Sequence, residues 1–278
     1  MSSLRESRRH GRPVHRRQAQ GQPGHGRPPG MRGLAIDLGS SRTRAWVPGR
    51  GLVLDPLTED AARRPVRRGR IVDPESCGRL LGRIADAALG PDRSDTVMVL
   101  SLPVLAGAEH RRAAKEILTA LGPAGVVVLD SARAAAAYAD PRGGGPLLVI
   151  DMGAELTEVT LLVDGMVADA RQAESGLSDP AADSVPGAVV RSVLDMIMSM
   201  WRQDRNGALR GALRKGPLLA GGGALRPDIT NRIAVRLGVP VRLADDPSTA
   251  VVRGAGLILG SVLRHPGTAP AALPGRPR

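Results

Sequence analysis

Short apolar runs alternate along this chain with longer segments whose apolar residues recur every three to four positions. The short runs predict strands and the periodic segments predict helices. Strands are expected near residues 34–36, 97–100, 126–129, 147–150, 159–163 and 218–219. Helices are expected near residues 75–89, 108–121, 131–140, 187–202, 227–237 and 248–263. This alternation predicts an α/β fold with mixed sheets.

Local signals support several of the helix ends. Asp73-Pro74 is a good helix start, because Asp caps a helix and Pro fits its first turn. Gly122 and Gly238 stand where helix C-caps are expected. The single cysteine, Cys77, falls in the apolar pattern of the first of these helices, so we expect it to be a buried small hydrophobe.

Composition and charge narrow the function classes. The net charge is +12, but residues 1–30 carry seven Arg and one acid and residues 264–278 carry three Arg, so most of the excess lies outside the predicted folded part. The aromatic side chains number only two Trp and one Tyr, too few to stack single-stranded bases, so no specific nucleic-acid partner is expected. One cysteine excludes an intramolecular disulfide. No apolar run approaches the ~18 residues of a membrane span, which predicts a cytoplasmic protein.

The two ends of the chain are predicted to be disordered. Residues 1–30 form a basic leader rich in Arg, Gly, Pro and His, which cannot bury enough apolar surface to fold. Met31 stands directly before the first predicted strand and is a candidate for the true start. Residues 264–278 form a second such segment.

Two segments have the same design, an apolar strand that ends in Asp-x-Gly and resumes as a second strand. They are Ile36 to Thr43 and Ile150 to Thr157, and a third glycine turn follows the apolar run at Leu218. Glycine turns expose backbone N–H groups, so two that face each other can hold a polyphosphate. An aspartate at each strand end can bind the water shell of Mg²⁺. One Asp-x-Gly is usually only a β-turn, whereas two in register followed by Gly-Gly-Gly is a stronger signal.

On these motifs the chain resembles the actin and heat-shock chaperone ATPase superfamily, and within it the MreB-type rod-shape-determining bacterial actins. The resemblance runs from Met31 to Leu263 in the family's order. Its parts are a first phosphate loop at 36–47, a connecting helix at 130–139, a second phosphate loop at 150–163, an adenosine loop at 218–229 and a second connecting helix at 244–259.

The resemblance implies an actin-like ATPase core of two similar lobes with mixed sheets around a nucleotide cleft. The expected domains are a first lobe at 31–140, a second lobe at 141–250 and a helix at 251–263 that returns to the first lobe. It further implies ATP or ADP with Mg²⁺ as cofactor. The implied partners are shape-determining actin paralogues or envelope-synthesis proteins, with peripheral contact to the inner face of the cell membrane.

Both outer subdomains of the family are nearly absent from this sequence. Only twelve residues separate Leu54 from Arg67, and nine separate Gly176 from Pro186, where the family carries whole subdomains. In the family these subdomains contribute to contacts between successive subunits. The resemblance therefore implies poor self-assembly for this chain.

The resemblance also implies an eroded nucleotide site. Ser131 stands where the family has the glutamate that positions the attacking water, and serine is a poor general base near neutral pH. Ala154 and Glu155 replace part of a glycine run. A carboxylate ~4 Å from a phosphate charge costs roughly 4 kcal/mol at an effective dielectric of about 20, which Mg²⁺ offsets in part. Weak binding and weak or lost hydrolysis of ATP are expected.

The remaining positions match the family. Asp37 and Asp151 would bind Mg²⁺ through water, and Arg42 would either reach a phosphate or stay solvated. The residues expected to contact the nucleotide are Asp37, Gly39, Ser40, Ser41, Arg42, Thr43, Asp151, Gly153, Ala154, Glu155, Thr157, Ala220, Gly221, Gly222 and Gly223.

Two classes of function follow. The first is a reduced MreB-like actin that acts as a cytoskeletal scaffold in cell-shape or envelope morphogenesis. The alternatives are a kinase-type phosphotransferase of the same superfamily, whose acceptor pocket usually comes from insertions that this chain lacks, and a decayed pseudo-ATPase regulator. The helix expected at 187–202 has an apolar stripe that ends at Trp201, which is either core or a partner surface.

Overall fold

A computed structural model describes residues 31–54, 64–141, 143–178 and 185–264. All of them belong to one compact unit that begins at Met31. The leader, the tail beyond Arg264 and parts of the two shortened segments lie outside the described residues. No helix in the described part of the chain is both long and apolar enough to cross a membrane.

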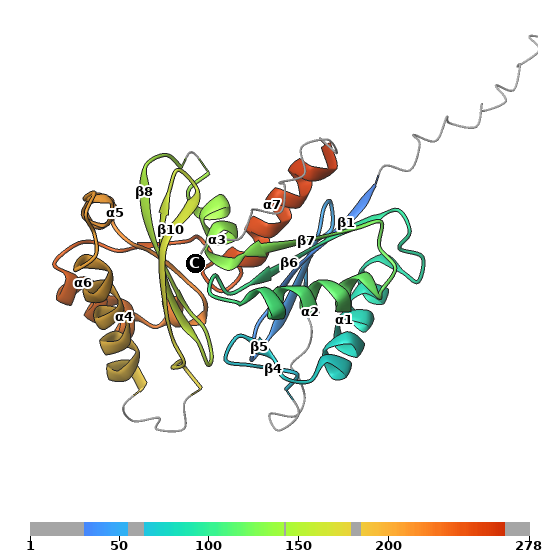
Figure 1. Ribbon diagram of the computed structural model, residues 1–278, viewed down its shortest axis with the longest axis horizontal. Coiled ribbons are helices and arrows are strands. Elements are labelled where there is room, and N and C mark those ends of the chain that lie inside the picture. Colours follow the sequence, from blue (N-terminus) through green and yellow to red (C-terminus); the bar gives the residue numbers. More distant parts are fainter. Residues whose placement is uncertain (1–30, 55–63, 142, 179–184, 265–278) are drawn as a thin grey trace, which may run out of the picture. The chain divides into compact units, whose positions relative to one another are not determined.

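The first sheet has five strands in the order β3-β2-β1-β6-β7, and Figure 1 labels β1, β6 and β7 among them. Strand β1 pairs antiparallel with β2 and parallel with β6, and β7 continues the parallel part. The bounds are β1 Arg32–Leu38, β2 Thr43–Val47, β3 Gly51–Leu54, β6 Thr96–Leu102 and β7 Gly125–Asp130. A separate small hairpin follows β3 and consists of β4 (Val66–Arg67) and β5 (Arg70–Ile71).

The second sheet repeats this topology in the order β10-β9-β8-β11-β12. Its central strand β8 pairs antiparallel with β9 and parallel with β11, as β1 does with β2 and β6. The bounds are β8 Pro146–Met152, β9 Thr157–Val163, β10 Met166–Ala173, β11 Leu218–Ala220 and β12 Arg242–Leu243. The predicted α/β class with mixed sheets is confirmed, and the two Asp-x-Gly segments occupy equivalent places in the two sheets.

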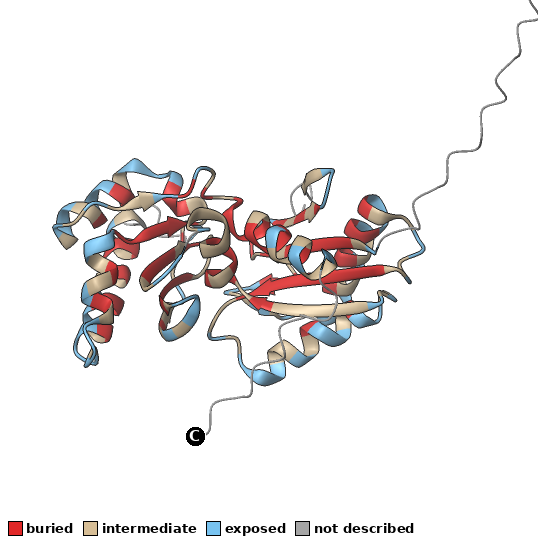
Figure 2. Cartoon of the chain, turned by 90° about the horizontal axis from the view of Figure 1, so that it is seen from above, coloured by how far each residue is buried: buried red, intermediate tan, exposed pale blue. Residues whose placement is uncertain are grey.

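Helices cover both sheets, and the buried side chains form three clusters. One cluster packs β1 and β6 against α1 (Pro74–Leu89) and α2 (Ala108–Thr119). Another packs β8 and β9 against α4 (Val185–Trp201), α5 (Ala208–Lys215) and α6 (Pro227–Leu237). The third contains residues of both sheets together with α3 (Ser131–Ala139) and α7 (Ala250–Arg264). Figure 2 shows the buried strands between partly exposed helices.

Most of the helix signals in the sequence act as expected, but α2 ends at Thr119 with Ala120 as its C-cap, so Gly122 is not the cap that the sequence predicted. The side chain of Asp73 accepts a hydrogen bond from the backbone N–H of Ser76 at 3.0 Å, which caps α1. Cys77 is fully buried, and burial raises the pKa of its thiol to about 12. Gly238 ends α6 with φ of +65°, a left-handed conformation that glycine adopts without strain.

The α4 stripe is core rather than a free surface. Val189, Val193 and Ile197 are buried in the second sheet's cluster, while Trp201 at the helix end is 40% exposed. Only the end of this helix therefore offers apolar area to a partner.

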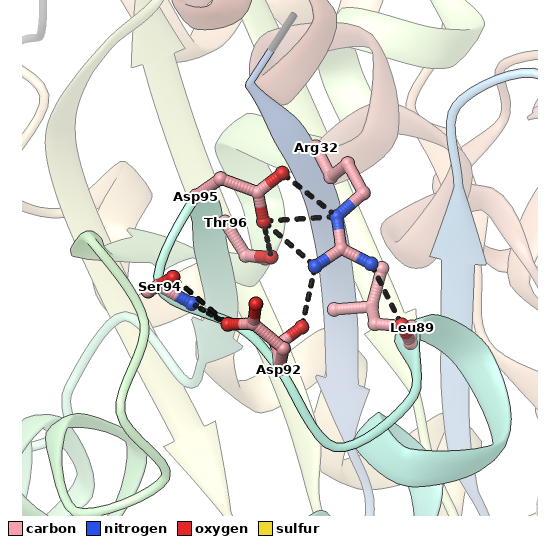
Figure 3. Close-up of polar contacts among 6 residues, drawn as sticks. All are labelled: Arg32, Leu89, Asp92, Ser94, Asp95 and Thr96. Atoms are coloured by element: carbon pink, nitrogen blue, oxygen red, sulfur yellow. Dashed lines mark hydrogen bonds and ion pairs between the residues drawn. The ribbon is translucent and has the colours of Figure 1, made fainter. Parts of the chain in front are cut away.

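An arginine fixes the start of the central strand β1 (Figure 3). The guanidinium of Arg32 donates to the Asp95 carboxylate at 2.7 and 2.9 Å and to the Leu89 carbonyl oxygen at 2.7 Å. It also donates to the carbonyl oxygen of Asp92. The hydrogen bond from Arg32 holds the pKa of Asp95 below its usual value. This network ties β1 to the end of α1 and to the loop before β6.

The two sheets are joined where α3 crosses α7. At this crossing Gly254 of α7 lies against the backbone of α3, so that an added Cβ atom would overlap the carbonyl oxygen of Ala134. Both residues are fully buried. Helices approach this closely only where small residues meet.

We predict that Gly254→Ala destabilises the fold by about 3 kcal/mol, because the added methyl group forces the two helices apart. Gly260→Ala in the same helix is the matched control, because its added Cβ would meet only the end of the Arg264 side chain, at 3.4 Å. The control should be neutral or gain up to about 1 kcal/mol from helix propensity. Urea denaturation followed by circular dichroism measures both, and equal midpoints would contradict the tight crossing.

Candidate functional site

A pocket of about 300 Å³ lies where the β1–β2 turn, the β8–β9 turn and the turn after β11 meet. It brings together most of the predicted site residues. Those that line it are Asp37, Gly39, Ser40, Ser41, Arg42, Ser131, Asp151, Gly153, Ala154, Glu155, Gly221 and Gly222. Three segments far apart in the sequence therefore form one site.

Four of the predicted residues do not line this pocket. Thr43 and Thr157 are buried, and the hydroxyl of Thr157 donates to the carbonyl oxygen of Ser175 at 2.9 Å. Ala220 is buried within β11. Gly223 is buried, and an added Cβ there would collide with the side chain of Met152. These four residues are buried next to the turns and support them without lining the pocket.

The two Asp-x-Gly turns have the same geometry. The N–H of Gly39 donates to the carbonyl oxygen of Arg42 at 3.2 Å, and the N–H of Gly153 donates to that of Leu156 at 2.8 Å. An added Cβ would lie 2.7 Å from the Arg42 oxygen in the first turn and 3.0 Å from the Leu156 oxygen in the second. The first turn therefore requires its glycine, and the second leaves little room for a larger residue.

The third turn places backbone directly beside an aspartate. Gly221 has φ of +80°, and its N–H donates to the carbonyl oxygen of Pro247 at 2.9 Å. An added Cβ at Gly221 would collide with the carboxylate of Asp151. Close backbone approach of this kind suits a loop that surrounds a ligand.

Each turn also carries a charged partner opposite its aspartate, and the two partners differ in sign. Asp37 pairs across the strands with Arg44, and the guanidinium lies 3.9 Å from the carboxylate. Asp151 pairs in the same way with Glu158, a second acid. Directly opposed residues of an antiparallel pair lie on the same face of the sheet, so the site has one neutralised aspartate and one that faces a like charge.

The pKa values reflect this difference. Burial raises the pKa of Asp37 to about 6, and Arg44 opposes the rise. Burial raises the pKa of Asp151 to about 7, and the charges of Asp37 and Glu158 add to the rise. Burial likewise raises the pKa of Glu158 to about 7. A cation placed between these carboxylates would relieve the repulsion.

Ser131 is engaged with Glu158. Its hydroxyl donates to one carboxylate oxygen of Glu158 at 3.2 Å, and the N–H of Val104 donates to the other at 3.0 Å. Both side chains are buried. Ser131 is thus part of a contact between the two lobes, because it begins α3 and Glu158 belongs to β9.

Glu155 turns its carboxylate toward the β4–β5 hairpin. One oxygen lies 3.2 Å from the Arg67 guanidinium and 3.6 Å from that of Arg64, and the other accepts from the N–H of Arg68 at 2.9 Å. The sequence predicted an added negative charge beside the phosphates. The structure shows that arginines offset this charge, and the sequence analysis had missed them.

Sequence reasoning missed other pocket residues, chiefly Arg44, Glu158, Ser101, Pro247 and Ser248. The sequence could have indicated Arg44 and Glu158, because each follows the aspartate of its turn by seven residues in a strand-turn-strand pattern. Arg42 lines the pocket and is exposed.

The residues present fit a Mg²⁺-nucleotide. Glycines line the turns where phosphates must approach backbone, and two mutually repelling aspartates would hold a cation. In the described part of the chain no three His, Cys, Asp or Glu side chains group as direct metal ligands.

Comparisons with known proteins agree with this geometry. The Actin family model matches residues 48–181, and the MreB/Mbl protein model matches residues 174–265. The cell shape-determining protein MreB of Pasteurella multocida is 25% identical, over 84% of this chain and 94% of that protein. That alignment spans 336 positions, more than the 278 residues of this chain, so the relative carries segments that have no counterpart here.

Solved structures show the same fold. MreB5 of Spiroplasma citri bound to ADP superposes with a TM-score of 0.74 and 17% identity, over 86% of this chain and 99% of that one. The MamK double helical filament gives a TM-score of 0.67 at 14% identity, over 82% of this chain and 98% of that one. The fold and site define an actin-like protein. Within that class, the chain is similar to the MreB-type bacterial actins, and segments of the MreB relative have no counterpart in it.

We predict that Asp151→Asn stabilises the metal-free protein at pH 8 by on the order of 1 kcal/mol and has little effect at pH 5. A carboxyl whose pKa is raised to about 7 holds its proton more tightly when folded. The free energy of unfolding therefore falls as the pH rises from about 4 to about 7, and the amide removes this loss.

Thermal unfolding in the presence of a chelator measures the effect. Asp195→Asn, at an exposed position of α4, is the control and should leave the melting temperature unchanged. A lower melting temperature of the Asp151 variant at pH 8 would contradict the assignment.

Proposed function

We propose that this chain is a reduced MreB-like actin that serves cell-shape or envelope morphogenesis as a cytoskeletal scaffold. The observation that carries the proposal is the pair of equivalent Asp-x-Gly turns that meet in one pocket, in a chain whose family includes a cell shape-determining protein. The scaffold works at the cytoplasmic side of the cell membrane. Its lobes comprise residues 31–140 and 141–250, with the helix at 251–263 returning to the first lobe.

The site binds Mg²⁺ with ATP or ADP weakly and hydrolyses ATP slowly or not at all. Glycine turns and opposed aspartates support binding, and a related structure holds ADP. Ser131 is a poor base, and its hydroxyl already donates to Glu158. The nucleotide then affects this scaffold through its binding and not through its hydrolysis.

Assembly depends on a partner, either a shape-determining actin of the same cell or an envelope-synthesis protein. The longer MreB relative carries segments that have no counterpart in this chain. A chain without these segments lacks the surfaces that they would contribute to contacts between subunits. The end of α4 supports a partner surface, because Met198 is 50% exposed and Trp201 is 40% exposed. The Arg210 guanidinium lies 5.4 Å from the centre of the Trp201 ring. Large aromatic and arginine side chains are favoured at interfaces.

We predict that the purified protein with Mg·ATP stays in the supernatant on ultracentrifugation and pellets only with a shape-determining actin from the same cell. Trp201→Ala should weaken this co-sedimentation about tenfold, since interface aromatics commonly contribute more than 1 kcal/mol. Val235→Ala, which shortens a side chain that is 78% exposed on α6, is the matched control. Abundant ordered filaments of the isolated protein would contradict the proposal.

A further inference from the structure

The β4–β5 hairpin carries three arginines, and Arg64 lies just before it; these four side chains converge on two acids of the second lobe, Glu155 and Glu174. Arg64 and Arg67 pair with Glu155. Arg68 pairs with Glu174 at 2.9 Å, and Arg70 lies 4.0 Å from the same carboxylate. Glu155 belongs to the β8–β9 turn of the candidate site, and Glu174 directly follows β10.

The backbone of the hairpin is shaped for this contact. Arg68 has φ of +49°, a left-handed conformation that costs energy for a residue other than glycine. In this conformation its N–H donates to the Glu155 carboxylate at 2.9 Å. The next residue, Gly69, lies so close to the second turn that an added Cβ would sit 2.7 Å from the Leu156 side chain. Its N–H reaches the Ser40 hydroxyl of the first turn at 3.4 Å.

Glu155 is well placed to carry most of this contact. Its side chain is only 13% exposed, whereas that of Glu174 is 44% exposed. Water screens a buried pair less than an exposed one, so the Glu155 contacts are the stronger set. On its other side the second turn is held by backbone hydrogen bonds from Leu177 to Gly153 and from Ser178 to Ala154.

We infer that Glu155 is an internal anion that fixes the second phosphate turn onto the β4–β5 hairpin without any bound nucleotide. In the proposed nucleotide site, phosphates held between the two turns would be the anions that connect them. Here a carboxylate of the chain supplies negative charge to three donors of the opposite half. Glu155 is therefore a positioning residue, and it keeps the site assembled when empty.

This inference concerns the regulation of the proposed nucleotide site and rests on it, but its test requires no nucleotide. Hydrogen exchange of the full chain, read by mass spectrometry without nucleotide, compares the wild type with Glu155→Gln. In the variant we expect about tenfold faster exchange in the segments 64–71 and 150–157, because local opening governs exchange there. The rest of the chain should be unchanged.

Glu116→Gln is the matched control, since it removes the same charge from an exposed pair with Arg112. It should leave both segments unchanged.

Raising KCl to about 0.5 M should speed exchange in both segments of the wild type, because salt screens ion pairs. Arg67→Gln should act in the same direction as Glu155→Gln, and the double variant should add little to the stronger single one.

Adding Mg·ADP should restore protection in Glu155→Gln, since phosphates would then supply the missing anion. Unchanged exchange in both segments of the variant would overturn the inference, and so would a uniform rise across the chain, which would mark a general loss of stability. If the nucleotide-free effect appears but Mg·ADP protects no variant, the internal anion stands and the proposed nucleotide site fails.

Discussion

The close crossing of α3 and α7 is the constraint on which the rest of the structure depends. Gly254 lets α7 touch the backbone of α3, and these two helices share a buried cluster with strands of both sheets. Because β1 and β8 are the central strands of two sheets with the same topology, joining the sheets also sets where their turns meet. The close approach of Gly254 to the backbone of Ala134 thus helps to set the geometry of the pocket.

Within that pocket, charge decides what the site can do. The first turn neutralises its aspartate with Arg44, whereas the second turn opposes Asp151 to Glu158 and adds Glu155. Hydrogen-bond donors and cations of the chain stabilise these carboxylates. Ser131 and the backbone N–H of Val104 donate to Glu158, and the β4–β5 hairpin supplies a backbone N–H and arginine side chains to Glu155. Groups that a nucleotide and its metal would otherwise satisfy are already partly satisfied by the protein. This arrangement supports the proposal that the site binds its ligand weakly.

Much of this could be predicted from the sequence. Periodicity located the helices α1, α2, α3, α4, α6 and α7 and the buried strands, and the repeated Asp-x-Gly segments indicated the paired turns. Strand β10 was missed because it is an edge strand whose residues include Asp169, Arg171 and Gln172, so no apolar run marks it. Helix α5 was missed because it has only eight residues and contains Gly211.

The charge pairing of the site was harder to predict. The N–H of Arg68 and the Glu155 carboxylate are 87 positions apart in the sequence, and only the folded chain brings them together. Sequence reasoning could count the acid in the second turn but could not find the cations that face it. The hydrogen bond of Ser131 was equally hard to predict, because its partner Glu158 belongs to the second sheet.

Calorimetric titration of the wild type and of Asp37→Ala with Mg·ATP tests the central claim, that the two turns form a preserved but weakened nucleotide site. The account predicts a measurable Kd for the wild type that is weaker than about 1 μM, which corresponds to about −8 kcal/mol, and loss of binding in the variant. The same affinity for both proteins, or no binding by the wild type at about 1 mM nucleotide, would contradict it.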